Sequence, residues 1–81
     1  MKIPRDISAE KLIKSLKKFG YLITRQKGSH IRLTAELNGK THHITIPNHN
    51  PIKIGTLNNI INDVSAFHRI AKDKVISELF D

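Results

Sequence analysis

The dipeptide Asn38-Gly39 lies between two runs of alternating apolar and polar residues, and it constrains the fold more than any other feature of the sequence. Asn-Gly favours a two-residue type I′ turn, because both residues tolerate positive φ. Such a turn pairs Leu37 with Lys40 and thereby fixes every later pair of the hairpin. The sequence therefore predicts two antiparallel strands, one from His30 to Leu37 and one that ends near Pro47.

This register separates the side chains of the hairpin into two different faces. The apolar face contains the pairs Ile31–Ile46, Leu33–Ile44 and Ala35–His42. The polar face contains the pairs Arg32–Thr45, Thr34–His43 and Glu36–Thr41. A slip of one residue would mix the two sets, so the pattern supports this register alone.

Amphipathic segments on both sides of the hairpin predict helices that cover its apolar face. Asp6 or Ser8 can cap the first helix, and Gly20 ends it. Its apolar stripe consists of Leu12, Ile13, Leu16 and Phe19. A second helix begins at Gly55 or Thr56. Its apolar stripe consists of Leu57, Ile60, Ile61 and Val64.

The remaining segments complete an α+β fold. Residues 21–25 favour a first strand, with a turn at residues 27–29, and the spacing of apolar residues predicts a short extra C-terminal helix over 72–80. We expect the order α-β-β-β-α with a three-stranded antiparallel sheet, followed by that short helix. A chain of 81 residues is expected to form one domain, residues 1–81.

The charge of the chain favours a polyanionic partner. Fourteen Lys and Arg residues against seven Asp and Glu residues give a formal net charge of +7. Four lysines lie opposite the apolar stripe of the first predicted helix: Lys11, Lys14, Lys17 and Lys18. They suit a nucleic acid backbone, although an ordinary solvated helix face has the same pattern.

Cysteine is absent, which suits a reducing cytosol. The first ten residues carry charges and a proline where a secretory signal would need an apolar run, and no apolar stretch is long enough for a membrane span. We therefore expect a cytoplasmic protein that has no membrane partner.

The five histidines are the groups that titrate near neutral pH, and they differ in their expected surroundings. His42 falls on the apolar face and is expected to be half-buried, whereas His68 is expected on the surface without neighbours. The adjacent His42 and His43 project to opposite faces and cannot hold one ion together. The sequence thus predicts neither a metal site nor a cofactor.

His30 is the candidate catalytic residue. It begins a strand just after a flexible turn, and Arg25, Lys27 and Arg32 are close in sequence. Cations there could stabilise the charge that develops on a phosphate during cleavage. The hairpin register places His30 opposite Pro47, so His49 is expected nearby to position or protonate a substrate. The alternatives are that His30 is an ordinary surface histidine among basic residues and that His49 is an ordinary loop residue.

Three segments together resemble the HicA family of toxins. They are Arg25-Gln26-Lys27-Gly28-Ser29-His30, then Ile44-Thr45-Ile46-Pro47 with His49, and Ile54-Gly55-Thr56-Leu57. The resemblance extends roughly from Ser8 to Val64. It implies a fold similar to a double-stranded-RNA-binding domain, cleavage of mRNA without the ribosome, and a HicB-type antitoxin that covers the active site. It also implies that His30, in the Gly-Ser-His triplet, is catalytic.

The leading hypothesis is an endoribonuclease toxin in which His30 acts as general acid or base. The expected RNA-binding residues are Lys11, Lys14, Lys18, Arg25, Lys27, Ser29, Arg32 and His49. Few aromatic residues are available for stacking on bases, so we expect a loose sequence preference. The alternatives are a noncatalytic RNA-binding module and a subunit whose basic face binds an acidic protein.

Overall fold

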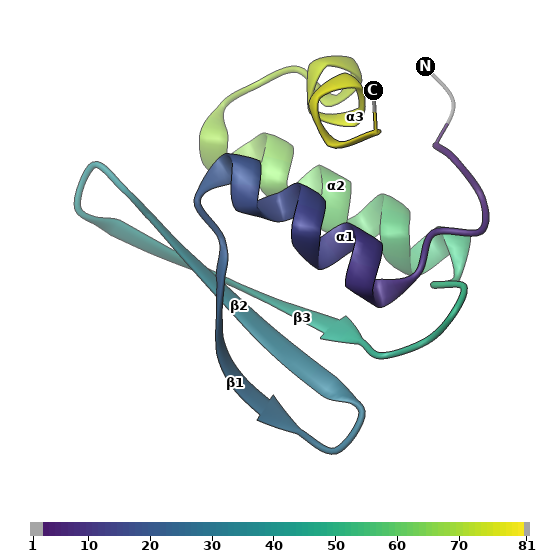
Figure 1. Ribbon diagram of the computed structural model, residues 1–81. Coiled ribbons are helices and arrows are strands. Elements are labelled where there is room, and N and C mark those ends of the chain that lie inside the picture. The colour runs from purple at the N-terminus through teal and green to yellow at the C-terminus, as the bar shows by residue number, and fades with distance from the viewer. Residues whose placement is uncertain (1–2, 81) are drawn as a thin grey trace.

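The fold is known from a computed structural model that describes residues 3–80. Residues 1, 2 and 81 of the predicted 1–81 domain lie outside the described residues. The elements are α1 (Ala9–Leu16), the 3₁₀ helix η1 (Lys17–Phe19), β1 (Leu22–Lys27), β2 (His30–Leu37), β3 (Lys40–Pro47), α2 (Ile54–His68) and α3 (Lys72–Phe80). The order and the antiparallel sheet β1-β2-β3 confirm the predicted α+β class (Figure 1).

The β2–β3 hairpin has the predicted register throughout, from His30–Pro47 to Leu37–Lys40. Asn38 and Gly39 both have positive φ, 53° and 77°, as a type I′ turn requires. The alternation of the sequence becomes an alternation of burial, because Ile31, Leu33 and Ala35 are buried whereas their neighbours on β2 are not.

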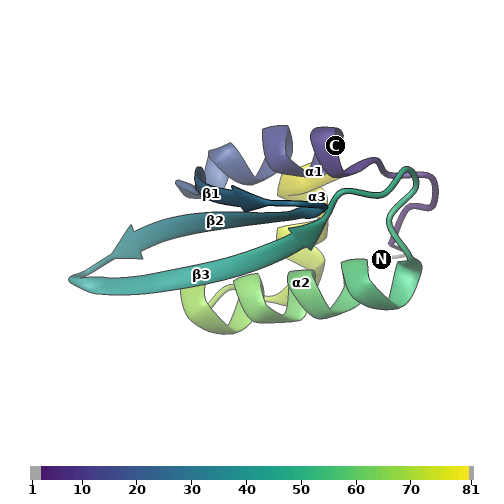
Figure 2. The same cartoon turned by 90° about the horizontal axis from the view of Figure 1, so that it is seen from below.

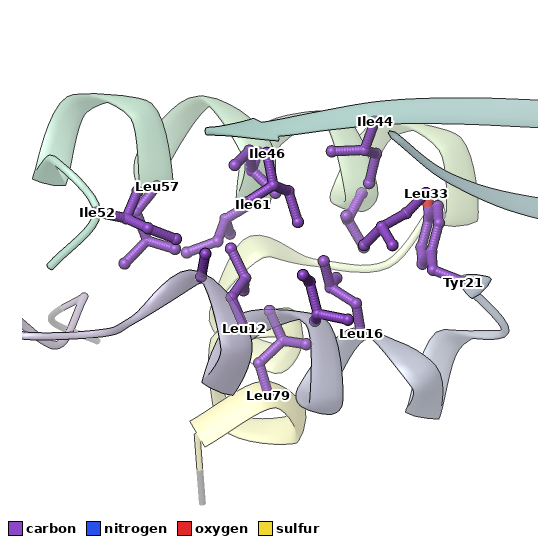
Figure 3. Packing of buried hydrophobic residues seen from close by; sticks show 14 of the residues in the cluster. Leu12, Leu16, Tyr21, Leu33, Ile44, Ile46, Ile52, Leu57, Ile61 and Leu79 are labelled. Atoms are coloured by element: carbon purple, nitrogen blue, oxygen red, sulfur yellow. The ribbon is translucent and has the colours of Figure 1, made fainter. Parts of the chain in front are cut away.

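The helices form two layers on one face of the sheet. α1 and α2 lie side by side against the sheet, and α3 lies on their far side (Figures 1 and 2). Residues from all three helices and from β2 and β3 meet in the core, where Leu12, Leu16, Leu33, Ile46 and Ile61 are fully buried (Figure 3). The opposite face of the sheet is left open to solvent.

The ends of α1 show which of the two expected caps operates. The Ser8 hydroxyl accepts a hydrogen bond from the Lys11 backbone N–H at 3.1 Å, so Ser8 is the N-cap and Asp6 is not. The α-helix ends at Leu16, earlier than its apolar stripe predicts. The turn η1 carries the chain on to Gly20, whose φ of 85° ends the helical segment.

Two other boundaries differ from the predicted ones. β1 extends to Lys27, because Lys27 pairs with His30 and leaves only Gly28 and Ser29 in the turn. α2 begins at Ile54, one residue before the first predicted start, and no side chain caps it. In the part of the chain that is described, no helix has both the length and the apolar character to cross a membrane.

Candidate active site on the outer face of the sheet

His30 is the first residue of β2 and lies beside a tight turn. Its neighbours across the sheet are Lys27 on β1 and Pro47 on β3. Gly28, the first residue of the turn, has a φ of 57°, which a glycine adopts without steric cost. Since the next residue, Ile31, faces the core, the exposed His30 side chain faces the solvent side of the sheet.

A shallow cavity of roughly 260 Å³ surrounds His30. All three strands contribute to its lining, which consists of Arg25, Lys27, His30, Arg32 and Thr45. Arg25 pairs with Arg32, and Arg32 pairs in turn with Thr45, so these side chains form a row next to the Lys27–His30 row. Three cations and one imidazole share this open cavity, and none of its lining residues is acidic. The cavity therefore attracts anions.

A β-bulge in β1 sets which residues reach this face. The pairing shifts by one residue between Ile23 and Arg25, and Thr24 is the extra residue. Ile23 can thus pair with the buried Leu33, while Arg25 and Lys27 remain on the outer face. The hydroxyls of Thr24 and Thr34 lie 2.7 Å apart and secure the bulge. An unbroken register would place Ile23 and Arg25 on the same face.

The loop after β3 is held against the turn that precedes His30. The Asn48 N–H donates to the Ser29 carbonyl oxygen at 2.6 Å, and the Ala9 N–H donates to the His49 carbonyl oxygen at 3.2 Å. The backbone at Ser29 thus fixes the loop, and the loop is tied to the start of α1. The His49 side chain is exposed but is not among the residues that line the cavity.

The lysines of the first helix are all exposed, but they do not form one surface with His30. Lys14 and Lys17 line a separate groove between α1 and β1, where Ile23 and Ile31 are also found. The Lys18 ammonium donates to the Glu78 carbonyl oxygen on α3 at 2.9 Å. Lys11, Lys14 and Lys18 therefore lie outside the cavity, and their RNA-binding role stays a prediction.

A second group of polar side chains lies between the helices and the end of the hairpin. The Tyr21 hydroxyl is hydrogen-bonded to Nδ1 of His42 at 2.7 Å and to Nε2 of His68 at 3.1 Å. His42 is half-buried, as predicted. The expectation for His68 is wrong, because this residue ends α2 and its ring contacts those of Phe19, Tyr21 and Phe67.

Burial sets the protonation of this Tyr21–His42–His68 network. Removal from water lowers the pKa of both His42 and His68, and for His68 the neighbouring His42 adds to the effect. For His42 the carboxylate of Asp63 opposes burial and His43 reinforces it. Burial, with a smaller effect of Asp63, raises the pKa of the Tyr21 hydroxyl. The network is therefore neutral at physiological pH.

Sequence reasoning identified four of the five cavity residues and missed Thr45. The hairpin register could have found it, because Thr45 stands opposite Arg32 on the polar face. No local signal links Tyr21 with His68, since 47 positions separate them. Among residues 3–80, no three His, Cys, Asp or Glu side chains are grouped so that they could hold a metal ion.

Comparison with known proteins adds one finding. The model of a family described as the HicA toxin of bacterial toxin-antitoxin matches residues 9–65 of the chain. The matched segment contains every residue that lines the cavity around His30. No curated protein and no solved structure gives a significant match.

Proposed function

The chain belongs to the HicA toxin family of bacterial toxin–antitoxin systems. We propose that it is an endoribonuclease that cuts mRNA and that His30 is its catalytic residue. One observation carries the proposal: an exposed imidazole shares an open cavity with Arg25, Lys27 and Arg32, and none of the residues lining that cavity is acidic. RNA supplies both the anion for the cations and the hydroxyl that an imidazole can activate.

In the proposed reaction the 2′-oxygen of a ribose attacks the adjacent phosphorus while the bond from phosphorus to the 5′-oxygen breaks. One proton leaves the 2′-hydroxyl and one reaches the departing 5′-oxygen. His30, as general acid or base, carries out one of these transfers, and water in the open cavity carries out the other. The products are a 2′,3′-cyclic phosphate and a 5′-hydroxyl, so no metal or cofactor is needed.

The cations of the cavity provide the second contribution to rate. Negative charge accumulates on the nonbridging phosphate oxygens during the transfer, and fixed cations stabilise it more than they stabilise the substrate. Arg25 and Arg32 are paired across neighbouring strands, and their planar guanidinium groups suit two-point contacts with phosphate oxygens. Rigid strands hold both groups beside His30.

Other residues are proposed to bind parts of the RNA that lie farther from the reacting phosphate. Lys11, Lys14 and Lys18 on α1, together with Ser29 and His49, extend the contact beyond the cavity. His49 remains a candidate for positioning the substrate, and unchanged cleavage by His49→Ala would exclude that role. The proposed partners are mRNA in the cytoplasm and a HicB-type antitoxin.

The test uses purified protein, long single-stranded RNA and excess EDTA, with DNA of the same sequence as the control. We expect cleavage of the RNA alone, with cyclic phosphate ends on the products, because DNA lacks the 2′-hydroxyl. RNA that is bound but not cut would contradict the proposal and indicate a noncatalytic binding module. Cleavage of the DNA would also contradict it, because the attacking oxygen would then come from water.

A further inference from the structure

A second cavity, of roughly 310 Å³, lies at the end of the hairpin remote from His30. Its lining comes from two places in the sequence, the turn of the hairpin and the last residues of α2: Leu37, Asn38, Lys40, Phe67, His68 and Arg69. The hairpin projects past the C-terminal end of α2 (Figures 1 and 2). The residues that line the cavity come from these two ends. The site proposed for cleavage uses none of these residues.

The chemistry of this lining suits a nucleotide. Lys40 and Arg69 are exposed cations, and none of the six lining residues is acidic, so the cavity favours an anion. Phe67 is partly exposed, so its aromatic ring is accessible for stacking on a base. A flat base can lie against this ring while a phosphate meets the cations.

The aromatic wall is held in place by the Tyr21–His42–His68 network. The Phe67 ring stacks on the His42 ring, with centroids 4.6 Å apart and planes 15° from parallel. His68 is fixed by its hydrogen bond to the Tyr21 hydroxyl. Preorganised rings lose little conformational freedom on binding, so this network gives the cavity a rigid wall.

The backbone at Arg69 makes this residue a suitable position at which to test the cavity. Arg69 follows His68 as the C-cap of α2 and has the left-handed conformation, with φ 56° and ψ 46°, and its N–H donates to the Ser65 carbonyl oxygen. Glycine usually occupies such a position, because any side chain there is strained. A glycine can therefore replace Arg69 and remove the guanidinium while the backbone conformation is kept.

We propose that this cavity is a nucleotide subsite for RNA, in which Lys40 and Arg69 bind a phosphate and Phe67 supports a base. The proposal rests on the proposed function, since the ligand is RNA bound by the same protein. β2 runs from His30 to Leu37, so the two sites are separated by about 23 Å along the strand. An RNA that occupies both sites must span at least this distance.

The test measures binding of a labelled 2′-O-methyl RNA by fluorescence anisotropy over a range of salt concentrations. This RNA lacks the free 2′-hydroxyl, so binding is measured whether or not the protein is a nuclease. The variants are Arg69→Gly, Lys40→Ala and Phe67→Leu, and Lys74→Ala on the exposed surface of α3 is the matched control. Thermal unfolding of each variant shows whether it is folded.

Arg69→Gly is the decisive variant. Relief of the strained φ offsets the added freedom of the unfolded chain, so its melting temperature should stay near that of the wild type. Its RNA binding should nevertheless weaken, and the slope of log Kd against log salt concentration should fall by about one for each cation removed. Phe67→Leu should weaken binding about fivefold or more.

An abasic ribose-phosphate oligomer of equal length tests the base contact. We expect it to bind more weakly than RNA and to be insensitive to Phe67→Leu. The subsite is contradicted if Arg69→Gly and Lys40→Ala keep the salt slope of Lys74→Ala, or if no RNA is bound. If the variants bind normally and the wild type still cuts RNA, the subsite is contradicted but the proposed function at His30 is not. If the variants bind more weakly but the wild type does not cut RNA, the nuclease function is contradicted but the subsite is not.

Discussion

The two histidine sites of this protein differ in what surrounds the imidazole. His30 lies on the open face of the sheet, in a cavity that it shares with three cations. His42 and His68 lie between α2 and the hairpin, where each ring bonds to the Tyr21 hydroxyl and contacts other aromatic rings. The first arrangement leaves the imidazole accessible to a substrate, as the proposed proton transfer requires, and the second makes the same chemical group part of the packed structure.

This contrast shows that residue type and local sequence do not decide the role of a histidine. Both His30 and His68 have basic residues close in sequence. Lys27 and Arg32 lie near His30, and Arg69 follows His68. Only the tertiary structure leaves one ring open and covers the other. Substitutions at the two sites should therefore separate catalysis from stability.

The largest effect on stability should come from Tyr21→Phe. The change keeps the ring in the core but removes the hydroxyl, so one nitrogen on His42 and one on His68 lose their partner. We expect the free energy of unfolding to fall by about 1–2 kcal/mol. The single-turnover cleavage rate per folded molecule, measured with saturating protein, should be unchanged because Tyr21 does not line the cavity around His30. Urea unfolding measures the first quantity and the RNA assay measures the second.

Thr34→Val is the matched control for that experiment. The Thr34 hydroxyl also joins two partners, Oγ1 of Thr24 at 2.7 Å and Nδ1 of His43 at 2.8 Å, but it does so on the exposed face. Because water can replace these contacts, the free energy of unfolding should fall by no more than about 0.5 kcal/mol. An equal loss in both variants would show that burial does not distinguish the two networks.

Arg25→Gln should have the opposite effect to Tyr21→Phe, because it should weaken RNA binding and cleavage but leave the stability of the fold nearly unchanged. Arg25 is exposed and lines the cavity around His30. The slope of log Kd against log salt concentration should fall by about one, and cleavage should slow. The free energy of unfolding should change by less than about 0.5 kcal/mol. A normal salt slope would show that RNA does not contact this face.

The smallest effect should be a loss of stability in mild acid. The pKa values of His42 and His68 are lowered in the folded protein, from an ordinary value of 6.5, so the unfolded chain binds more protons as the pH falls through that value. Stability should be full above this pH and decrease below it. Melting temperatures measured from about pH 7.5 to about pH 5.5 test this, and Tyr21→Phe should change the dependence more than Thr34→Val.

The parts of the fold that sequence could predict are those encoded locally. The Asn38-Gly39 turn and the strict alternation around it determined every pair of the hairpin. The cavity could be predicted because Arg25, Lys27 and Arg32 lie within five positions of His30 on paired strands. These features need no knowledge of distant contacts.

The parts that sequence could not predict depend on distant contacts or on residues that suit either face. Thr24 gives no sign of a bulge, because threonine is accepted on both faces of a strand. Tyr21 meets His68 only after α2 has folded back across the sheet. The contact of Lys18 with the Glu78 carbonyl oxygen likewise depends on where α3 lies.

The most direct test of the central claim compares cleavage of RNA in EDTA by the wild type, His30→Ala and His43→Ala. Both histidines face the outer side of the sheet, but only His30 lines the cavity with the three cations. His30→Ala should lower the single-turnover rate about 10²–10⁴-fold while RNA is still bound, and His43→Ala should cut at nearly the wild-type rate. Cleavage by a folded His30→Ala protein at the wild-type rate would contradict the account and place the chemistry elsewhere.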